Sequence, residues 1–273
     1  MENIRQAIER AKGRSREQND ISLAPSPQRI NYGLGDVRDS KECIQEFELD
    51  RAHLQSQRII AYDGKDPRSR PFDILRTEVL QSMDRKGWKT LAVTSPTPSC
   101  GKTLTAVNLA LSMARQPERQ VFLADLDLRK PKVAASLGLK CREGVLGVIE
   151  GRIEADSAIV RARVGSSRLE VLPTAPTSDS SDLISSGATR TLLQEIAGYG
   201  QSRIVIFDLP PLLTGHDVIS ILPQIDCVLL VAAVGTSTVS EIEECNKHLQ
   251  TTDVVRFVLN KVPESSTSYA AYY

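Results

Sequence analysis

Residues 88–108, WKTLAVTSPTPSCGKTLTAVN, decide the fold of this chain. The segment predicts an apolar strand, a loop that ends in Gly101-Lys102-Thr103, and the start of a helix, which is the layout of a phosphate-binding loop. In such a loop, backbone N–H groups and the helix N-terminus point at phosphate oxygens, and a glycine lets the main chain approach closely. The segment therefore predicts a nucleotide-binding site.

The polar residues of this loop have a chemical use in that layout. Lys102 supplies a positive charge for the terminal phosphates, and Thr103 offers a hydroxyl to the Mg²⁺ ion that accompanies them. Pro96 stands where the general G-x-x-x-x-G-K-[ST] pattern has its first glycine, so the match is only partial. We expect the loop to contact ATP through Pro98, Ser99, Cys100, Gly101, Lys102, Thr103 and Leu104.

Two further apolar strands end in aspartate. QVFLADLDLRKP at residues 120–131 contains Asp125 and Asp127, and RIVIFDLPP at residues 203–211 contains Asp208. Carboxylates at the C-terminal ends of buried strands lie at the crevice where open α/β sheets bind ligands. Each aspartate alone could be a turn residue or a helix cap. Together with the GKT loop, they indicate magnesium and phosphate chemistry.

Length and patterning predict a P-loop NTPase-like α/β fold. A chain of 273 residues with 41% apolar residues can bury a full core. The alternation of strands and helices predicts a mostly parallel twisted sheet with helices on both faces. We expect a helix over residues 71–84, with Ile74, Leu75 and Leu80 as its buried side, and a second helix over residues 178–196.

The domain organisation is predicted from local composition. Residues 1–40 predict an amphipathic N-terminal helix and a flexible connector, residues 41–262 the P-loop domain, and residues 263–273 a tyrosine-rich tail. Residues 227–234 form the longest uninterrupted apolar stretch, which is far too short to span a bilayer.

Charge and cysteine content exclude several classes of protein. The net charge is zero and the pI is about 6.8, so nothing indicates nucleic-acid binding. The five cysteines form no C-x-x-C pair, as expected of a reduced cytoplasmic protein, and the charged N-terminus is unlike a secretory signal. Cys100 lies inside the phosphate loop, where it is either a redox-sensitive thiol or a small tolerated loop residue.

The order of motifs resembles the bacterial tyrosine kinases of exopolysaccharide and capsule synthesis. SPTPSCGKT is followed by ADLDLRKP, IVIFDLPP and VLNKV, and the chain ends in SYAAYY. In that family the first three motifs are called Walker A, Walker A′ and Walker B, and the tail is the autophosphorylation target. The resemblance, which runs from about Phe47 to the C-terminus, therefore makes Tyr269, Tyr272 and Tyr273 the expected phosphoacceptors.

The resemblance and the chemistry of phosphoryl transfer assign roles to the site residues. We expect Lys102 to neutralise the γ-phosphate of ATP, while Thr103 and Asp127 hold Mg²⁺ directly or through water. Asp208 is expected to act on the ion indirectly, through the groups that bind it. Asp125 is expected to accept a proton from the acceptor phenol or to orient it.

Three other positions have two interpretations or a minor role. Arg129 is expected among the ATP contacts. Asn260 is expected to contact the adenine, as an Asn or Arg does in related ATPases, or to be a satisfied strand-end asparagine. Asp217 resembles a position near the active site in the family, and it also fits the N-cap of a helix that starts at Val218.

The resemblance also implies partners. These are an inner-membrane polysaccharide chain-length or export protein that acts as activator and recruits the chain to the inner face of the plasma membrane, and a cognate tyrosine phosphatase. Members of the family commonly pair subunits into a ring through an E-x-x-R-x-x-R pattern, whose positions here are Arg70, Asp73 and Arg76. The charge order is reversed at the first two, so a homo-oligomer of this kind needs a partner surface of changed sign.

Two other classes of function stay open. The first is a dimerising ATPase switch resembling the plasmid-partitioning (ParA) and septum-positioning (MinD) proteins. Those proteins carry an additional lysine early in the loop, where this chain has Thr97 or Pro98, and that difference favours the kinase. The second is a nucleotide-binding scaffold with weak catalysis, which the altered Ser99-Cys100 pair would suit.

Overall fold

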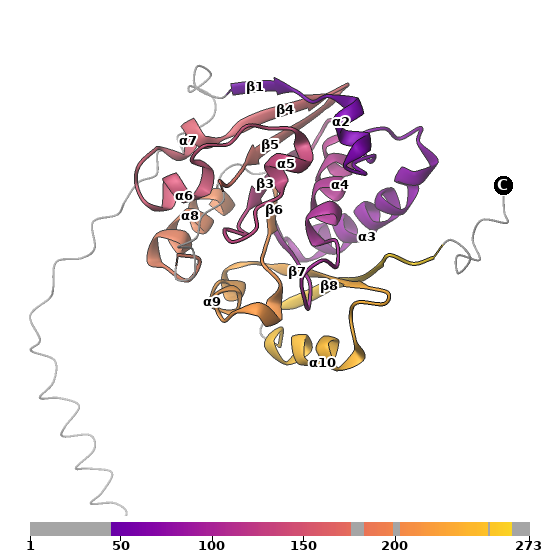
Figure 1. The fold of residues 1–273 in the computed structure, drawn as a ribbon, viewed down its shortest axis with the longest axis vertical. Helices are drawn as coiled ribbons and strands as arrows, with labels where there is room; N and C mark the ends of the chain where they lie inside the picture. The colour runs from indigo at the N-terminus through magenta and orange to yellow at the C-terminus, as the bar shows by residue number, and fades with distance from the viewer. Residues whose placement is uncertain (1–44, 176–182, 199–202, 251, 264–273) are drawn as a thin grey trace, which may run out of the picture. The chain divides into compact units, whose positions relative to one another are not determined.

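The computed structural model describes residues 45–175, 183–198, 203–250 and 252–263, all within one compact unit (Figure 1). The helix and connector expected over residues 1–40 lie outside the described residues. So do the three tyrosines of the tail.

A single sheet of eight strands organises the described part of the chain, in the order β1-β4-β5-β3-β6-β2-β7-β8 (Figure 1). Neighbouring strands are parallel except for the antiparallel pair β4 and β5. The strands are β1 (Gln45–Glu48), β2 (Thr90–Thr94), β3 (Gln120–Asp125), β4 (Val160–Val164), β5 (Ser167–Leu172), β6 (Arg203–Asp208), β7 (Cys227–Ala233) and β8 (Asp253–Asn260). The expected mostly parallel sheet is confirmed.

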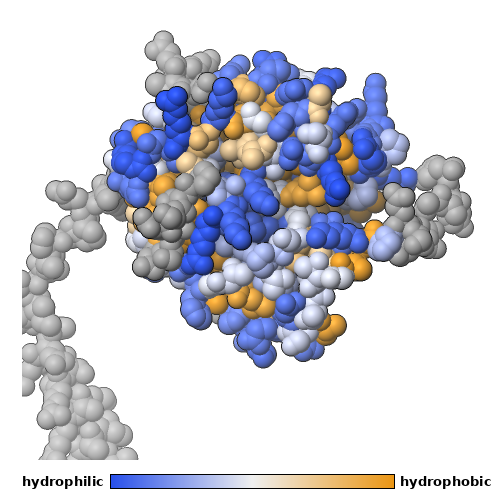
Figure 2. All heavy atoms as spheres, in the orientation of Figure 1, coloured by the Kyte–Doolittle hydropathy of each residue, from blue (hydrophilic) through white to orange (hydrophobic). Residues whose placement is uncertain are grey.

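Helices cover both faces of the sheet. Alternate strand residues point to opposite sides, so Leu91 and Val93 of β2 pack with α2, α3, α4 and α5, while Ala92 packs with α6, α8, α9 and α10. The helices are α2 (Arg51–Ser56), α3 (Arg70–Lys86), α4 (Lys102–Ala114), α5 (Val133–Leu137), α6 (Gly144–Ile149), α7 (Ala155–Ala158), α8 (Gly187–Gly198), α9 (Asp217–Ile221) and α10 (Val239–His248), with short 3-10 helices at Pro67–Ser69, Leu212–Thr214 and Leu222–Gln224. On the face drawn in Figure 2, hydrophobic residues form scattered patches between hydrophilic ones.

The helix predicted over residues 71–84 is α3, but its buried side differs from the prediction. Leu80 is buried, together with Val79 and Met83, whereas Ile74 is 53% exposed. The prediction for Ile74 is wrong because the stripe that faces α4 passes through Asp73 instead, about 100° around the helix.

Asp73 belongs to a network within the chain. Its Oδ1 accepts hydrogen bonds from Ser112 Oγ at 2.6 Å, Arg115 NH1 at 2.8 Å and Arg76 NH1 at 3.3 Å. This network ties the start of α3 to the end of α4. Two of the three positions of the family's ring pattern are therefore engaged inside this chain.

The second predicted helix starts later than expected. In the described residues α8 begins at Gly187, after a turn over residues 183–186. Ser186 Oγ accepts a hydrogen bond from the N–H of Thr189 at 3.1 Å, which is the bond of a capping serine. A serine thus caps this helix, and the cap sets its start.

One buried side chain connects α4 to the segment before α3. Asn108 is fully buried, and its Oδ1 accepts hydrogen bonds from the N–H groups of Ile60 at 2.9 Å and Ala61 at 3.0 Å. Its Nδ2 donates to the carbonyl oxygens of Arg58 at 3.2 Å and Leu104 at 2.9 Å. Asn108 therefore supplies the partners of a segment that has no sheet or helix to pair with.

We expect Asn108→Ala to lower the free energy of unfolding by about 2–4 kcal/mol, because it leaves two backbone N–H groups without an acceptor. Urea unfolding followed by circular dichroism measures this change. The control is Gln81→Ala on the exposed side of α3, where the change should stay within about 0.5 kcal/mol. Equal effects of the two substitutions would contradict the assigned role of Asn108.

Candidate active site

The loop between β2 and α4 has a backbone that suits phosphate. Ser99 and Gly101 have φ values of 67° and 94°, in the left-handed region. A Cβ atom on Gly101 would lie 2.1 Å from Nδ2 of Asn260, so a larger residue would displace that amide and would also strain the backbone at this φ. Left-handed residues next to a helix N-terminus turn successive N–H groups to one side, which makes a cradle for anions.

Two residues expected to contact ATP lie behind this loop. The Cys100 thiol is buried, 3.2 Å from the carbonyl oxygen of Thr97 and 3.3 Å from Oγ of Ser237. Asn260 Nδ2 donates to the carbonyl oxygen of Cys100 at 2.9 Å, and Asn260 Oδ1 accepts from the N–H of Lys261 at 2.8 Å. Both side chains therefore fix the loop from its far side.

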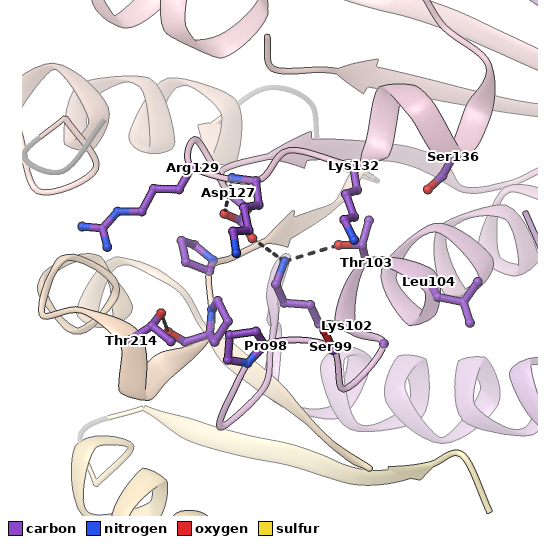
Figure 3. Close-up of a pocket in the computed structure, with 14 residues that line it drawn as sticks. Pro98, Ser99, Lys102, Thr103, Leu104, Asp127, Arg129, Lys132, Ser136 and Thr214 are labelled. Carbon is purple, nitrogen blue, oxygen red and sulfur yellow. Dashed lines mark hydrogen bonds and ion pairs between the residues drawn. The ribbon is translucent and has the colours of Figure 1, made fainter. Parts of the chain in front are cut away.

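Lys102 is the centre of the charged cluster. Its Nζ lies 2.8 Å from Oδ2 of Asp127 and 3.3 Å from Oγ1 of Thr103 (Figure 3). It also lies 3.4 Å from Oδ1 of Asp208. Thr103 Oγ1 donates to Asp208 Oδ2 at 2.6 Å. The structure thus brings together four residues that the sequence assigned to one site.

Asp125 lies next to this cluster, but its carboxylate points to the backbone of the segment that follows β3. It is fully buried, and its carboxylate accepts hydrogen bonds from the N–H groups of Asp127 at 3.2 Å, Lys132 at 3.0 Å and Val133 at 3.0 Å. Asp125 therefore holds the backbone that follows β3, including the residue that presents the Asp127 carboxylate.

Burial and neighbouring charges shift the pKa values of the cluster. Burial, and then the Asp208 carboxylate, raises the pKa of Asp125 from 3.8 to about 8. Burial also raises the pKa of Asp208. For Lys102, burial favours the neutral amine, but Asp208, Asp127 and Asp125 together outweigh it, so its pKa is raised. Lys102 is therefore charged at neutral pH, and burial favours the protonated form of Asp125.

A cavity of about 560 Å³ opens in front of the cluster. The expected residues that line it are Pro98, Ser99, Gly101, Lys102, Thr103, Leu104, Asp127 and Arg129, and those that do not are Cys100, Asp125, Asp208 and Asn260. Sequence reasoning did not assign Lys130, Lys132, Ser136 and Thr214 to this cavity. The run of basic residues after Asp127 in the sequence could have indicated that Lys130 and Lys132 lie near phosphate. No sequence pattern around Ser136 indicates its position in the cavity.

Arg129 and Asp217 close one side of the cavity rim. Arg129 NH2 lies 3.1 Å from Asp217 Oδ2, which joins the loop after β3 to the start of α9. The N-cap of α9 is His216, and its side chain makes no capping bond. The N-cap interpretation of Asp217 is therefore wrong, because its carboxylate binds Arg129 instead.

The residues present fit a magnesium nucleotide. Across the described ranges, no three His, Cys, Asp or Glu side chains form a metal cluster. Mg²⁺ keeps several water ligands and is usually held by one or two protein groups plus phosphate oxygens. Thr103 and Asp127 supply a hydroxyl and a carboxylate on the cavity wall, and Ser99 and Gly101 of the loop line the same cavity.

Comparison with known proteins assigns the family. Residues 91–272 match the CobQ/CobB/MinD/ParA nucleotide binding domain, so the chain belongs to this family of nucleotide-binding proteins. Tyrosine-protein kinase YwqD of Bacillus subtilis (strain 168) is 29% identical to it over 227 residues, which cover 81% of this chain and 93% of YwqD. Tyrosine-protein kinase wzc of Salmonella typhimurium is 24% identical over 243 residues, which cover 88% of this chain and 33% of wzc.

Solved structures show the same similarity. The kinase domain of Escherichia coli tyrosine kinase ETK is 26% identical, with a TM-score of 0.62 over 73% of this chain and 78% of that one. The resemblance to bacterial tyrosine kinases is thereby confirmed. None of the helices in the described part of the chain is long and apolar enough to cross a membrane.

The buried carboxyls predict how stability depends on pH. Because the folded pKa of Asp125 is about 8 against an ordinary 3.8, the native state binds more protons than the unfolded chain between these values. Stability therefore falls as pH rises through this window. Lys102→Met removes the charge that lowers the pKa values of Asp125 and Asp208, so its stability should fall more steeply.

Urea midpoints at about pH 5 and about pH 8 test this prediction. The deficit of Lys102→Met relative to the wild type should be larger at the higher pH. Lys65→Met, at an exposed position away from the site, should show no such difference. A deficit that is the same at both pH values would contradict the assigned proton on the carboxyl cluster.

Proposed function

We propose that this protein is an ATP-dependent protein-tyrosine autokinase that phosphorylates its own C-terminal tyrosines and acts in exopolysaccharide or capsule synthesis or export. One observation carries the proposal. Lys102 is held by Asp127 and Asp208 beside Thr103, at the wall of a 560 Å³ cavity. The similarity to named tyrosine-protein kinases then favours phosphoryl transfer over other uses of this site.

Lys102 binds the terminal phosphates in this mechanism. Its ammonium is already desolvated by its surroundings, with 10% of the side chain exposed. A cation in such a site acts more strongly on a phosphate than it would in water, and it needs no reorganisation during transfer. The N–H groups of the loop and of the first turn of α4 share the negative charge.

Thr103 and Asp127 would hold Mg²⁺, with Asp208 behind Thr103. Held by these residues, Mg²⁺ would supply positive charge beside the charge that develops on the phosphate. Thr103 Oγ1 donates its hydrogen bond to Asp208 and accepts one from Lys102 Nζ, so a lone pair of its oxygen remains to serve as a ligand. Asp208 thus acts by orienting Thr103.

The contact with the acceptor phenol was expected of Asp125, but Asp125 is fully buried and does not line the cavity. Asp127 does line it, so we assign this contact to Asp127. The phenolic oxygen attacks the γ-phosphorus of ATP, the bond from that phosphorus to the ADP oxygen breaks, and the phenol proton passes to a carboxylate or to water. A tyrosine with a pKa near 10 needs only modest help beside a divalent cation. Asp125 positions Asp127 through its bond to the Asp127 N–H.

The acceptors in this proposal are Tyr269, Tyr272 and Tyr273. Residues 1–40 would serve as an N-terminal docking segment and connector, residues 41–262 as the kinase domain, and residues 263–273 as the acceptor tail. An inner-membrane polysaccharide chain-length or export protein would activate the kinase and recruit it from the cytoplasm, and a tyrosine phosphatase would reverse the reaction. A ring of subunits would need contacts other than Asp73, whose carboxylate is engaged within the chain.

A dimerising ATPase switch is the second candidate. It is supported by the family description, which names MinD and ParA. The loop has Thr97 or Pro98 where those proteins carry their additional lysine, and that difference favours the kinase.

Incubation with γ-labelled ATP and Mg²⁺ tests the proposal, with the activator segment of an export protein present and absent. The wild type should acquire label on tyrosine. Lys102→Met should lower the rate by about 10²–10³, because it removes a preorganised charge from the transferring phosphoryl group. A chain that ends after Ser266 should lose the label but still bind ATP.

Lys65→Met is the matched control and should label like the wild type. ATP hydrolysis without label on protein would replace the kinase with the switch. Nucleotide binding with neither hydrolysis nor label, even with the activator segment, would leave the nucleotide-binding scaffold. Absence of nucleotide binding would overturn the proposal.

A further inference from the structure

A second cavity, of about 520 Å³, is lined in part by the segment that follows α5. Lys132 and Ser136 line the first cavity, and Lys140 to Gly144 line the second. Both cavities therefore lie near the edge of the sheet where β3 and β5 end. Volumes of this size are typical of pockets that hold small ligands or side chains.

The wall of this cavity is apolar. Phe47, Ile153 and Pro173 contribute to it. Cys141 lies among them as a neutral thiol, because burial, and then the Asp125 carboxyl, raises its pKa to about 11. Such a wall suits a flat aromatic ring.

The rim of this cavity is cationic. Lys140 and Arg142 are exposed, and within the described ranges neither makes an ion pair. Glu143 also lines the cavity, but its charge is paired with Arg152. Lys140 and Arg142 end a segment, residues 128–142, that contains five cations and no acidic residue. The wall and the rim together fit a ligand with an aromatic body and an anionic end.

We propose that this second cavity binds a phosphotyrosine side chain from the tail of a second copy of this chain. The phenyl ring would lie against the apolar wall, and the phosphate would pair with Lys140 and Arg142. Arg and Lys clusters commonly read phosphate in this way, through charge-assisted hydrogen bonds. This inference rests on the proposed function, which supplies the phosphotyrosine.

Chain length favours a second copy over the same chain. β4, next to the cavity, lies six strand positions from β8, which is about 29 Å at about 4.8 Å per strand. From Pro263, six extended residues reach Tyr269 in about 20 Å, and nine reach Tyr272 in about 31 Å. The chain's own tail could therefore reach the cavity only as a straight line, whereas a neighbour's tail has no such limit.

An anionic membrane is the other surface that such cations could bind, and two observations disfavour it. Arg129, Lys130 and Lys132 also line the first cavity, so a bilayer against this strip would cover the entrance to the nucleotide site. The apolar residues of the same segment, among them Leu137 and Leu139, are buried and cannot insert into lipid.

The test uses the full chain with its three tail tyrosines changed to Phe, so that its own tail stays unphosphorylated. A fluorescent peptide of residues 263–273 is synthesised with and without phosphate on Tyr272, and binding is followed by anisotropy. The phosphopeptide should bind at least about tenfold more tightly than the plain peptide. Since its phosphate is introduced by synthesis, the result does not depend on kinase activity.

Two variants remove different parts of the proposed site. The double substitution Lys140→Ala and Arg142→Ala removes the rim cations, and Ser157→Trp fills the cavity from an exposed position on its wall. Each should abolish the preference for the phosphopeptide. The control pair Lys65→Ala and Arg168→Ala, both exposed and outside the lining of either cavity, should keep it.

Equal binding of the two peptides by the unaltered site would overturn the proposal, and so would wild-type phosphopeptide affinity in either variant. Vesicles of phosphatidylcholine with phosphatidylserine provide the membrane arm. If the rim variant loses vesicle binding and keeps phosphopeptide binding, the strip is a lipid surface and the proposal is wrong. If the chain binds the phosphopeptide but never phosphorylates itself with labelled ATP, the proposed kinase function is wrong and the proposed phosphotyrosine site stands.

Discussion

The contact of the Lys102 ammonium with the carboxylates of Asp127 and Asp208 is the interaction on which the site depends. Three segments far apart in sequence supply these groups, and they meet because β3, β6 and β2 are adjacent in the sheet. Asp125 and Asp208 are direct partners in the register of β3 and β6, which packs two carboxyls side by side in the interior. Without the lysine this arrangement would carry uncompensated buried charge, so the fold and the site require each other.

The sequence was sufficient to predict the sheet, its covering helices and the residues of the charged cluster, since these depend on apolar runs and on the polar residues directly after them. It did not predict the direction in which a side chain points once its strand is paired. Asp125 and Asp127 are two residues apart, yet one faces the backbone of its own loop and the other the cavity. The wrong prediction for Ile74 has a similar cause. The side of α3 that faces α4 is set by Asp73 and its hydrogen-bond partners, and hydrophobicity alone does not reveal it. The second cavity combines residues from Phe47 to Pro173, which no local pattern connects.

The loop departs from the general pattern without losing its shape. Cys100 occupies a buried position in which its thiol contacts Ser237. The segment after β7 therefore accommodates this cysteine in the loop. Ser237 also accepts from the N–H of Ala233, which fixes the end of that strand. The unusual residue is thus part of the packing under the loop, and the surface that the loop presents to the cavity is formed by Pro98, Ser99 and Gly101.

Asn260 gives this arrangement a mechanical aspect. It fastens the last residue of β8 to the carbonyl of Cys100, and Lys261 follows with a left-handed φ of 57°, so the chain changes direction immediately after the attachment point. The exit path of the C-terminal segment and the position of the loop are consequently not independent. A force on the chain beyond Lys261 would therefore act first on the hydrogen bond from Asn260 to the carbonyl oxygen of Cys100, the residue next to Gly101.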